Sequence, residues 1–532
     1  MKYWQLSGVR LNLSEKENAL RVKTAALLNI EPSDIAEMEI VRKSIDARRR
    51  KAPQFVYVLK IGLLAHIQPK KRIKDFVRLE EIKKEPAMPL SVALSAIPNP
   101  VVVIGSGPAG MFAAYELSRH RVPVILLERG RVVEQRVEDV EKFWNGQGLN
   151  PQSNVLFGEG GAGTFSDGKL TSRAKSPLAA WVKRIFVEMG AQPEILVDAK
   201  PHIGTDRLRK IVADFRKKLI AMGCRVEFNA CVTDFIVQRN EIKALIVNDR
   251  DEIKTDRVIL AMGQSAEDTY RVLFERGFMM AAKPFAMGLR AEHPQALINE
   301  IQYGKWRGHP KLPPAEYFLT SHVPDLNRFV YSFCMCPGGA VIGCSTHEGY
   351  LCVNGMSNAR RSGKFANAAL VVNIRVEDFS RDSNPLSGLD FRSVWERKTY
   401  LAGGLGFHAP AQKMTDFLIG KQSDALQKTS YRPGVTCASL DEVLPDFAAE
   451  AIKRGLREFD KKMRGFITEE AYLIGVETRT SAPVRICRRK DGQSETVKGV
   501  YPCGEGAGYA GGIISSAIDG IQAAQRLLES LR

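Results

Sequence analysis

A glycine-rich turn around residue 105 sets the strongest limit on how this chain can fold. The segment from Val101 to Gly110 reads VVVIGSGPAG, so an apolar strand, a GxGxxG turn and a helix start follow one another directly. The first glycine permits the tight turn, the second lets backbone approach a pyrophosphate, and the third lets the helix pack closely on the strand. Glu128 ends the next apolar strand, where a carboxylate can accept from ribose hydroxyls. The pattern predicts a βαβ unit that binds a dinucleotide, FAD or NAD rather than NADP.

A second glycine-rich segment lies near the C-terminus. It contains Gly504-Glu505, and then Gly511-Gly512-Ile513 before an apolar helical stretch. Together the two segments resemble the glutathione-reductase-like FAD superfamily, in which a Gly-Asp or Gly-Glu pair meets the flavin side of the cofactor. The resemblance implies that Glu505 accepts from ribityl hydroxyls. It also implies that the helix after Gly512 starts beside the flavin ring, where its N–H groups and dipole favour negative charge at N1 and O2. The alternative is a glycine-rich surface loop before an ordinary helix.

Three further segments extend this resemblance. Ala261-Met262-Gly263 matches the small residues that end the superfamily's last strand before the chain leaves the domain, and Cys231-Val232 matches backbone that packs against adenine. The loop Gly158–Leu170 is similar to a loop that wraps flavin and pyrophosphate in fumarate-reductase-like flavoproteins; a mobile surface loop is the alternative. The predicted cofactor-binding residues are Gly105, Gly107, Pro108, Ala109, Gly110, Glu128, Arg129, Gly163, Thr164, Ser166, Asp167, Lys169, Val232, Ala261, Gly263, Gly504, Glu505, Gly511, Gly512 and Ile513.

Over nearly its whole length the chain resembles a bacterial family of FAD-dependent, or NAD(FAD)-utilising, dehydrogenases. The segments that carry this likeness are Arg42–Arg48 in a basic N-terminal domain, Cys334–Gly339 (CMCPGG) and Gly475–Ser481 (GVETRTS). The resemblance implies the fold, FAD as cofactor and an oxidoreductase activity. It implies no particular substrate.

The predicted fold class is α/β, with a doubly wound, Rossmann-like FAD-binding domain, an inserted mixed α+β substrate domain and a small N-terminal βαββ domain of ferredoxin-like type. In the N-terminal domain, strands are expected at 3–13, 38–44 and 54–61, with a helix from the capping box Ser14-Glu-Lys-Glu17 to Leu28. The predicted divisions are 1–85 for the basic N-terminal domain, 86–97 for a linker, 98–280 and 481–532 for the two parts of the FAD-binding domain, and 281–480 for the substrate, or cap, domain.

Composition and charge limit the partners of the chain. No run of 18 apolar residues occurs, so no membrane span is expected, and nine irregularly spaced cysteines favour a reducing cytoplasm. The net charge is +17, and residues 1–95 alone hold 19 Lys and Arg against 11 Asp and Glu. This asymmetry is compatible with a nucleic-acid partner, but a solvated basic surface is favoured because no nucleic-acid motif accompanies the charge. The expected partner is a small-molecule substrate.

The residues that carry the chemistry are less well defined by the sequence. The catalytic candidates are Cys334, Cys336, Arg479 and His293; for the thiols the alternative is a packed core position, and for the others a structural role. The spacing of the cysteines is not a zinc pattern, so no metal is expected. Outside the first glycine turn no second nucleotide motif is convincing, so NAD(P)H would act only as a transient electron donor. Two rival functions remain: a flavin-dependent tRNA-modifying enzyme, and a non-catalytic flavin-binding sensor or interaction protein.

Overall fold

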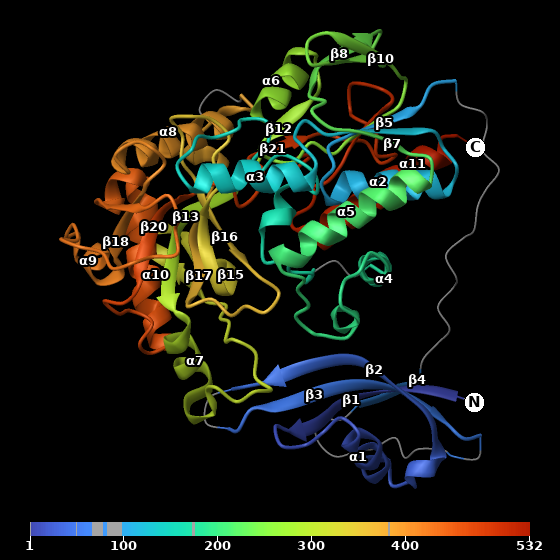
Figure 1. The fold of residues 1–532 in the computed structure, drawn as a ribbon, viewed down its shortest axis with the longest axis vertical. Helices are drawn as coiled ribbons and strands as arrows, with labels where there is room; N and C mark the ends of the chain where they lie inside the picture. The colour runs from blue at the N-terminus through green and yellow to red at the C-terminus, as the bar shows by residue number, and fades with distance from the viewer. Residues whose placement is uncertain are drawn as a thin grey trace.

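The computed structural model describes residues 2–48, 51–65, 67, 78–81, 98–172, 176–380 and 384–531. Figure 1 shows three bodies: a small sheet formed by the N-terminal residues, a parallel sheet with long helices, and a second large sheet built from the middle of the chain. The predicted linker 86–97 lies outside the described residues.

The N-terminal domain is a four-stranded antiparallel sheet covered by one described helix. Its strand order is β2-β3-β1-β4. Alternating apolar residues of β1 and β3, such as Leu6 and Leu59, form its core with Leu20 of the helix. The expected strands are confirmed, and β4 is an addition; the ferredoxin-like assignment stays a prediction. The elements are β1 (Lys2–Asn12), α1 (Ala19–Leu28), β2 (Ile35–Asp46), β3 (Gln54–Leu63) and β4 (Arg78–Glu81).

The predicted capping box at Ser14 is wrong. Helix α1 begins only at Ala19, and residues 13–18 form turns. The Glu17 carboxylate accepts instead from Lys43 Nζ at 2.7 Å and Tyr57 Oη at 3.0 Å, so it cannot reach back to cap a helix. Contacts with the sheet therefore override the local helix signal.

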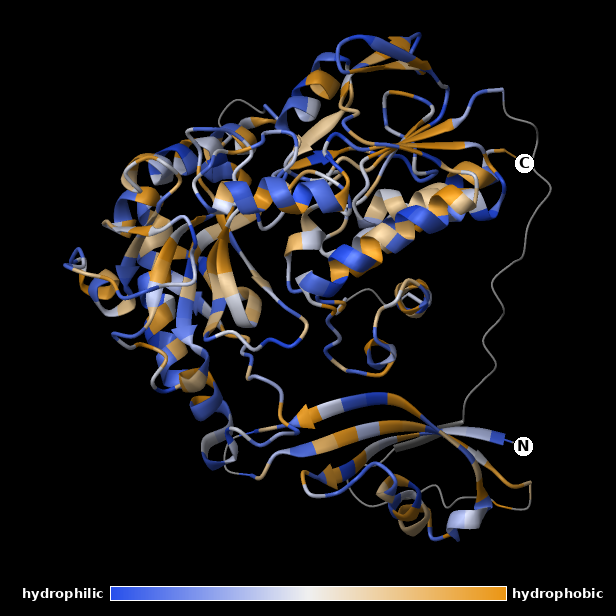
Figure 2. Ribbon diagram, viewed as in Figure 1, coloured by the Kyte–Doolittle hydropathy of each residue, from blue (hydrophilic) through white to orange (hydrophobic). Residues whose placement is uncertain are grey.

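The parallel-sheet domain confirms the predicted βαβ unit. Its five strands follow the order β22-β11-β5-β6-β7, all parallel. Helices α2, α5 and α11 cover one face, and the hairpin sheet β10-β9-β8 covers the other. Because both faces are buried, strands such as β5 are continuously apolar (Figure 2). The elements are β5 (Val101–Ile104), α2 (Pro108–Arg119), β6 (Val124–Leu127), α3 (Val133–Trp144), α4 (Leu178–Glu188), α5 (Thr205–Ala221), β7 (Arg225–Glu227), β8 (Val232–Gln238), β9 (Glu241–Val247), β10 (Asp251–Lys254), β11 (Val258–Leu260), α6 (Glu267–Glu275), β22 (Val500–Pro502) and α11 (Ile513–Glu529).

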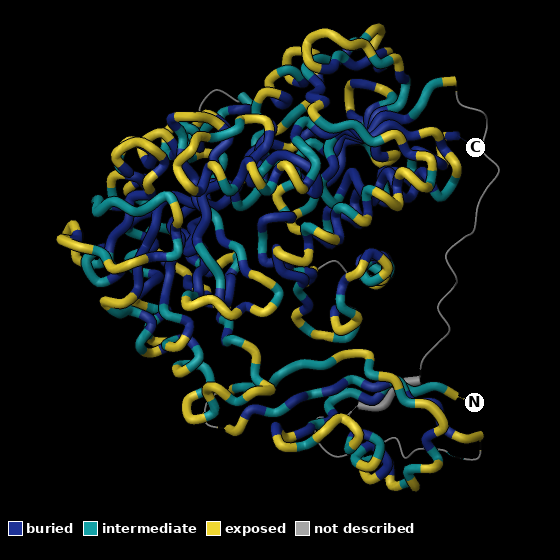
Figure 3. The backbone as a smooth tube through the Cα atoms, in the orientation of Figure 1, coloured by how far each residue is buried: buried dark blue, intermediate teal, exposed yellow. Residues whose placement is uncertain are grey.

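The eight-stranded-sheet domain follows in the chain. Its main order is β14-β15-β17-β13-β20-β18-β19, with β16 paired to β15, and most residues of its central strands are buried (Figure 3). Helix α10 covers one face. The elements are β13 (Phe285–Pro294), α7 (Gln295–Tyr303), β14 (Thr320–Val323), β15 (Arg328–Gly343), β16 (Val353–Ser357), β17 (Phe365–Ile374), α8 (Ser387–Ala402), β18 (Ala409–Lys413), α9 (Met414–Ile419), β19 (Val435–Cys437), α10 (Asp446–Lys462) and β20 (Tyr472–Glu477).

A two-stranded ribbon marks the passage between the two large domains. Strand β12 (Met280–Ala282) pairs antiparallel with β21 (Val484–Ile486), so the chain leaves and re-enters the parallel-sheet domain side by side. These crossings lie next to the divisions expected after residues 280 and 480. Among the described residues, no helix is both long and apolar enough to cross a membrane.

Candidate functional site

The glycine turn after β5 has a separate steric reason for each glycine. Gly105 has φ +97°, and a Cβ there would lie 2.4 Å from the Ala261 carbonyl oxygen. A Cβ at Gly110 would lie 1.8 Å from the carbonyl oxygen of Gly105, so this glycine serves helix–strand packing. At Gly107 the nearest described atom to a Cβ is Gly161 Cα at 3.9 Å. The space above Gly107 is therefore left for something other than the protein chain.

Two helices begin at this same place. Helix α2 starts at Pro108 and helix α11 at Ile513. They pack closely because Gly520 of α11 has no side chain: a Cβ there would lie 2.0 Å from the Ala109 carbonyl oxygen. Gly512, the residue before α11, has φ +86° and no described atom within 4 Å of its Cβ position. Two helix N-termini, with their free N–H groups and positive dipole ends, thus meet one cavity.

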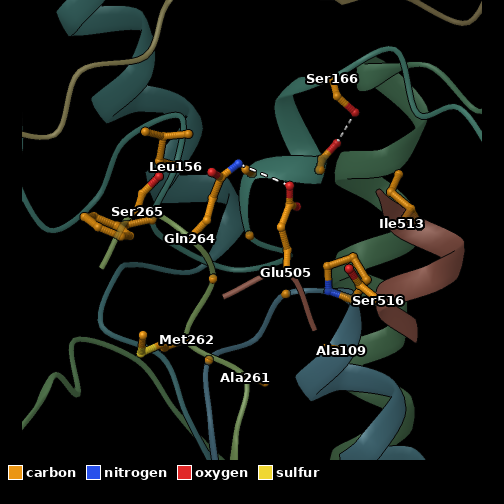
Figure 4. Close-up of a pocket in the computed structure, with 18 of the residues that line it drawn as sticks. Ala109, Leu156, Ser166, Ala261, Met262, Gln264, Ser265, Glu505, Ile513 and Ser516 are labelled. Carbon is orange, nitrogen blue, oxygen red and sulfur yellow. Dashed lines mark hydrogen bonds between the residues drawn. The ribbon is translucent and has the colours of Figure 1, made fainter. Parts of the chain in front are cut away.

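Most of the predicted cofactor residues line a single cavity (Figure 4). Predicted residues that line it are Gly105, Gly107, Pro108, Ala109, Glu128, Arg129, Gly163, Ser166, Asp167, Lys169, Val232, Ala261, Gly263, Glu505, Gly512 and Ile513, together with the catalytic candidates Cys334 and Arg479. Lining residues that the sequence did not single out include Leu156, Phe157, Gln264, Ser265, Thr269, Phe333, Asn354, Glu477 and Ser516. The cavity is lined by both large domains.

Four predicted cofactor residues do not line the cavity. Gly110 packs α2 on β5, and the Thr164 hydroxyl donates to the Glu159 carbonyl at 3.1 Å. The Gly504 N–H donates to Asp519 at 2.7 Å, and the Gly511 N–H to the Ser515 hydroxyl at 3.2 Å. These residues shape the backbone that surrounds the cavity.

His293 lies away from the cavity. Its ring is fully buried, packs against Tyr317 and Phe466, and contacts the Phe466 carbonyl oxygen through Nε2 at 2.8 Å. Burial lowers the pKa of His293 to about 4. The structure therefore does not bring this candidate proton donor to the other candidates.

The Glu128 carboxylate joins three turns at one end of the cavity. Oε2 accepts from the Ser106 N–H at 2.9 Å and the Ser106 hydroxyl at 2.7 Å. Oε1 accepts from the N–H groups of Gly130 at 2.9 Å and Gly158 at 3.0 Å. Besides the predicted ribose contact, this carboxylate thus fixes the walls of the site.

The loop 158–170 is firmly held. The fully buried guanidinium of Arg136, on α3, donates to the carbonyl groups of Asn154, Val155, Gly158, Glu159 and Gly161 at 2.7–3.2 Å. The loop includes the short 3-10 helix Ala162–Phe165. The carbonyl groups of Gly158, Glu159 and Gly161 thereby tie the start of this loop to α3. Arg136 could not be recognised in the sequence, because its partners are backbone carbonyl groups, which every residue carries.

The eight-stranded sheet contributes ionisable groups to the other end of the cavity. Cys334 lines it from β15, and Glu477 from β20. Arg290 donates to Glu477 Oε2 at 2.8 Å. Burial raises the pKa of Glu477 to about 7, although Arg290 opposes this shift. Lys169, from the glycine-rich loop, pairs with Asp167 at 2.6 Å and donates to the Met335 carbonyl.

Arg479 also reaches the cavity, but its guanidinium is largely occupied. It donates to both oxygens of the buried Glu396, at 2.9 and 2.7 Å. Its Nη1 has no hydrogen-bond partner among the described residues, and the same is true of Gln264 Oε1. Both buried atoms belong to residues that line the cavity. Unpaired polar atoms of this kind are costly unless a ligand satisfies them.

These features fit an extended dinucleotide such as FAD. The glycine positions 107 and 512 leave room that a Cβ would fill, two helix N-termini point to the same space, and two of the lining residues carry an unpaired polar atom. The side chains of Glu505 and Gln264 point toward one another, with Nε2 3.2 Å from Oε1 (Figure 4). Among the described residues, no group of three or more His, Cys, Asp or Glu is arranged to hold a metal ion.

Matches to family models agree with this fit. A family described as "FAD-dependent protein, C-terminal domain-like" matches residues 284–480, an NAD(P)-binding Rossmann-like domain matches 103–143, and a domain of unknown function matches 5–62. Among solved structures, the halogenase PltM in complex with FAD has 10% identity over 81% of this chain and 69% of its own, with a TM-score of 0.37. Glycine oxidase from Bacillus cereus has 11% identity over 82% of this chain and 96% of its own, with a TM-score of 0.33.

A relative that aligns with almost the whole chain shows its family. An uncharacterized protein of Clostridium beijerinckii is 42% identical over 528 residues, which cover 99% of this chain and 98% of the relative. The chain therefore belongs to one family with that protein, a family of FAD-dependent flavoproteins with a Rossmann-like domain, and its cofactor is FAD.

Proposed function

We propose that the protein is an FAD-dependent oxidoreductase that acts on a small molecule bound between the flavin and the eight-stranded sheet. The observation that carries this proposal is that a single cavity is lined both by the glycine turn with the α11 start and by Phe333, Cys334, Asn354 and Glu477 of the sheet. FAD supplies the exchange of an electron pair when it is bound. The residues of the sheet then have the task of binding, orienting and protonating the substrate.

The cofactor is held by groups of the parallel-sheet domain. The N–H groups at the start of α2, beside Gly107, bind the pyrophosphate, and Glu128 and Arg129 lie at the adenosine end. Arg129 lies over the Phe157 ring, 4.4 Å from its centroid, and pairs with Asp268 at 3.0 Å. Glu505 and the start of α11 meet the ribityl chain and the flavin, as in the glutathione-reductase-like superfamily. These assignments rest on the cavity lining and on the sequence resemblance.

Glu477 is the group best suited to handle a substrate proton. It lines the substrate end of the cavity, and Arg290 fixes its position through Oε2. With a pKa raised to about 7 by burial, its carboxyl both holds and releases a proton near neutral pH. The substitution Glu477→Gln keeps the shape and removes the titration, so the pH dependence of kcat should lose one limb.

NADH or NADPH is the proposed transient electron donor, and anaerobic mixing tests the whole proposal. Holoprotein is mixed with NADH, NADPH or candidate metabolites, and the flavin absorbance is followed. Rapid bleaching by one of them, with turnover when an acceptor is added, is the expected result. If none reduces the flavin while dithionite does, the protein is a non-catalytic flavin protein instead.

An RNA substrate is not favoured by the surface near the N-terminal domain. A second cavity lies between this domain and the rest of the chain, and basic and acidic side chains both line it. Lys43 is paired there with Glu17 at 2.7 Å, and Arg48 with Asp46 at 2.7 Å. A partly neutralised surface gives little attraction for phosphates. Tight RNA binding that weakens steeply with salt would argue for the RNA-modifying alternative.

A further inference from the structure

The CMCPGG segment forms a β-bulge at the substrate end of the cavity. Phe333 pairs with Ala369 and Cys336 with Asn367, so two residues of β15 lie opposite one residue of β17. Cys334, the first of the two, has φ +46°, in the left-handed region that only a tightly constrained non-glycine residue adopts. The bulge brings the Cys336 Sγ within 3.3 Å of the Cys334 carbonyl oxygen, to which the thiol donates.

Two cations hold this bulge. Arg290 Nη2 donates to the Cys334 carbonyl at 2.7 Å and contacts Cys336 Sγ at 3.4 Å. Lys169 donates to the carbonyl of Met335. Lys169 is itself held by Asp167, which accepts from Arg361 Nε at 3.0 Å. The Cys334 carbonyl thus accepts from the buried Arg290, and the Met335 carbonyl from the half-buried Lys169.

The two sulfur atoms are electrostatically different. The neighbouring Cys336 thiol, together with the positive charges of Lys169 and Arg290, holds the pKa of the Cys334 thiol well below its usual range. The neighbouring Cys334 and burial raise the pKa of Cys336 well above its usual range. One thiolate beside one thiol is the state from which a disulfide forms readily.

Cys334 is also close to the part of the cavity where the flavin is expected. It lines the same cavity as Glu505, Gly512 and Ile513. Cys336 is fully buried behind it. One cysteine of the pair, Cys334, therefore faces the cavity, and the other, Cys336, is buried in the protein.

We propose that Cys334 and Cys336 form a redox pair that exchanges two electrons with bound FAD. The Cys334 thiolate and the Cys336 thiol lose two electrons and one proton as the sulfur–sulfur bond forms, and FAD, the oxidant, takes up the same two electrons and proton. The reverse transfer opens the disulfide. The proposal rests on FAD binding but not on the identity of the proposed substrate.

The count of electrons taken up per FAD tests this pair without any substrate. Holoprotein is oxidised with the thiol oxidant diamide, desalted and titrated anaerobically with dithionite. We expect the wild type to take up two electron equivalents per FAD more than Cys334→Ser or Cys336→Ser, because each variant lacks the disulfide. Reduced wild type should also show a long-wavelength absorbance from thiolate beside oxidised flavin that Cys334→Ser lacks.

A second thiol pair provides the matched control. Cys344 and Cys352 lie with their sulfur atoms 3.0 Å apart, but both are buried and neither lines the cavity. Burial raises the pKa of Cys344, so no thiolate is favoured there. Cys352→Ser should keep the additional equivalents that Cys334 and Cys336 supply. Equal uptake by wild type and Cys336→Ser would overturn the proposal.

Peptide mapping covers the case in which a serine variant fails to fold or to bind FAD. In diamide-treated wild type, the peptide with Cys334 and Cys336 should resist alkylation and lack two hydrogens in mass. If both thiols are alkylated after this treatment, the pair does not form a disulfide and the proposal is wrong.

Discussion

Removing the Glu128 carboxylate should loosen three turns of the site even without FAD. In Glu128→Ala the backbone N–H groups of Ser106, Gly130 and Gly158 lose their acceptor. Glu128 is only 5% exposed, so water replaces the carboxylate poorly. Each buried donor left unpaired costs about 1–3 kcal/mol, and three together about 3–9 kcal/mol. That is comparable with the whole stability of a typical domain, about 5–15 kcal/mol. We therefore expect local opening rather than a rigid, empty pocket.

Hydrogen exchange, measured by mass spectrometry on FAD-free protein, detects this local opening of the three turns directly. Peptides that contain residues 101–110, 128–132 and 154–163 should exchange faster in Glu128→Ala than in wild type, and the FAD affinity should fall. Glu116→Ala is the control, because that buried carboxylate contacts side chains of Arg119 and Gln525 and none of the three turns. Unchanged exchange in Glu128→Ala, with only FAD affinity reduced, would show that the carboxylate serves the ribose alone and that the reasoning is wrong.

Three other substitutions test the cofactor site. Gly107→Val should fold, because Gly107 has φ −70° and an open Cβ position, yet it should be purified without FAD; full occupancy would contradict the pyrophosphate assignment. Gly512→Pro should disrupt the start of α11 and abolish FAD binding, because proline cannot adopt the φ of +86° found at this position. A variant that is fully loaded with FAD and has an unchanged flavin potential would show that this helix does not face the ring. Burial raises the pKa of Glu505 to about 7, and ribityl hydroxyls would favour its ionised form, so FAD should bind more tightly above pH 7 than below it. Glu505→Gln should make the measured Kd independent of pH in this range; a wild-type Kd that is already flat would remove Glu505 from the ribityl contact.

The parts of the site that follow from local geometry were predictable from the sequence. Gly105 and Gly110 each have a steric reason that lies within one turn of the chain or in the adjacent strand, and the open Cβ position of Gly107 is set by the same turn. Any sequence with this pattern between a strand and a helix is subject to the same steric limits on a Cβ. The apolar strands of the parallel sheet are equally local, because burial on both faces needs a continuous apolar run.

The groups that depend on distant partners were not predictable in this way. Arg136 acts through five carbonyl groups of a loop, and its position on α3 resembles any charged position on an amphipathic helix. Cys334 and Cys336 were visible as a motif. Their environment was not, because it depends on a bulge against β17 and on Arg290 from β13. The same limit explains His293, whose aromatic neighbours turn a candidate proton donor into a core residue.

Asp167 and Lys169 show why the two halves of the site have to be considered together. Both belong to the glycine-rich loop, and both line the cavity. Asp167 pairs with Arg361, from the segment between β16 and β17, and Lys169 donates to the Met335 carbonyl in the bulge of β15. Asp167 and Lys169 are also paired with each other, so the glycine-rich loop is tied to the eight-stranded-sheet domain by two charge-assisted contacts, one of which reaches the thiol-bearing strand. Replacing Asp167 would leave the buried Arg361 guanidinium without its carboxylate, and replacing Lys169 would remove the donor to the Met335 carbonyl, so the loop and the bulge depend on each other for their structure.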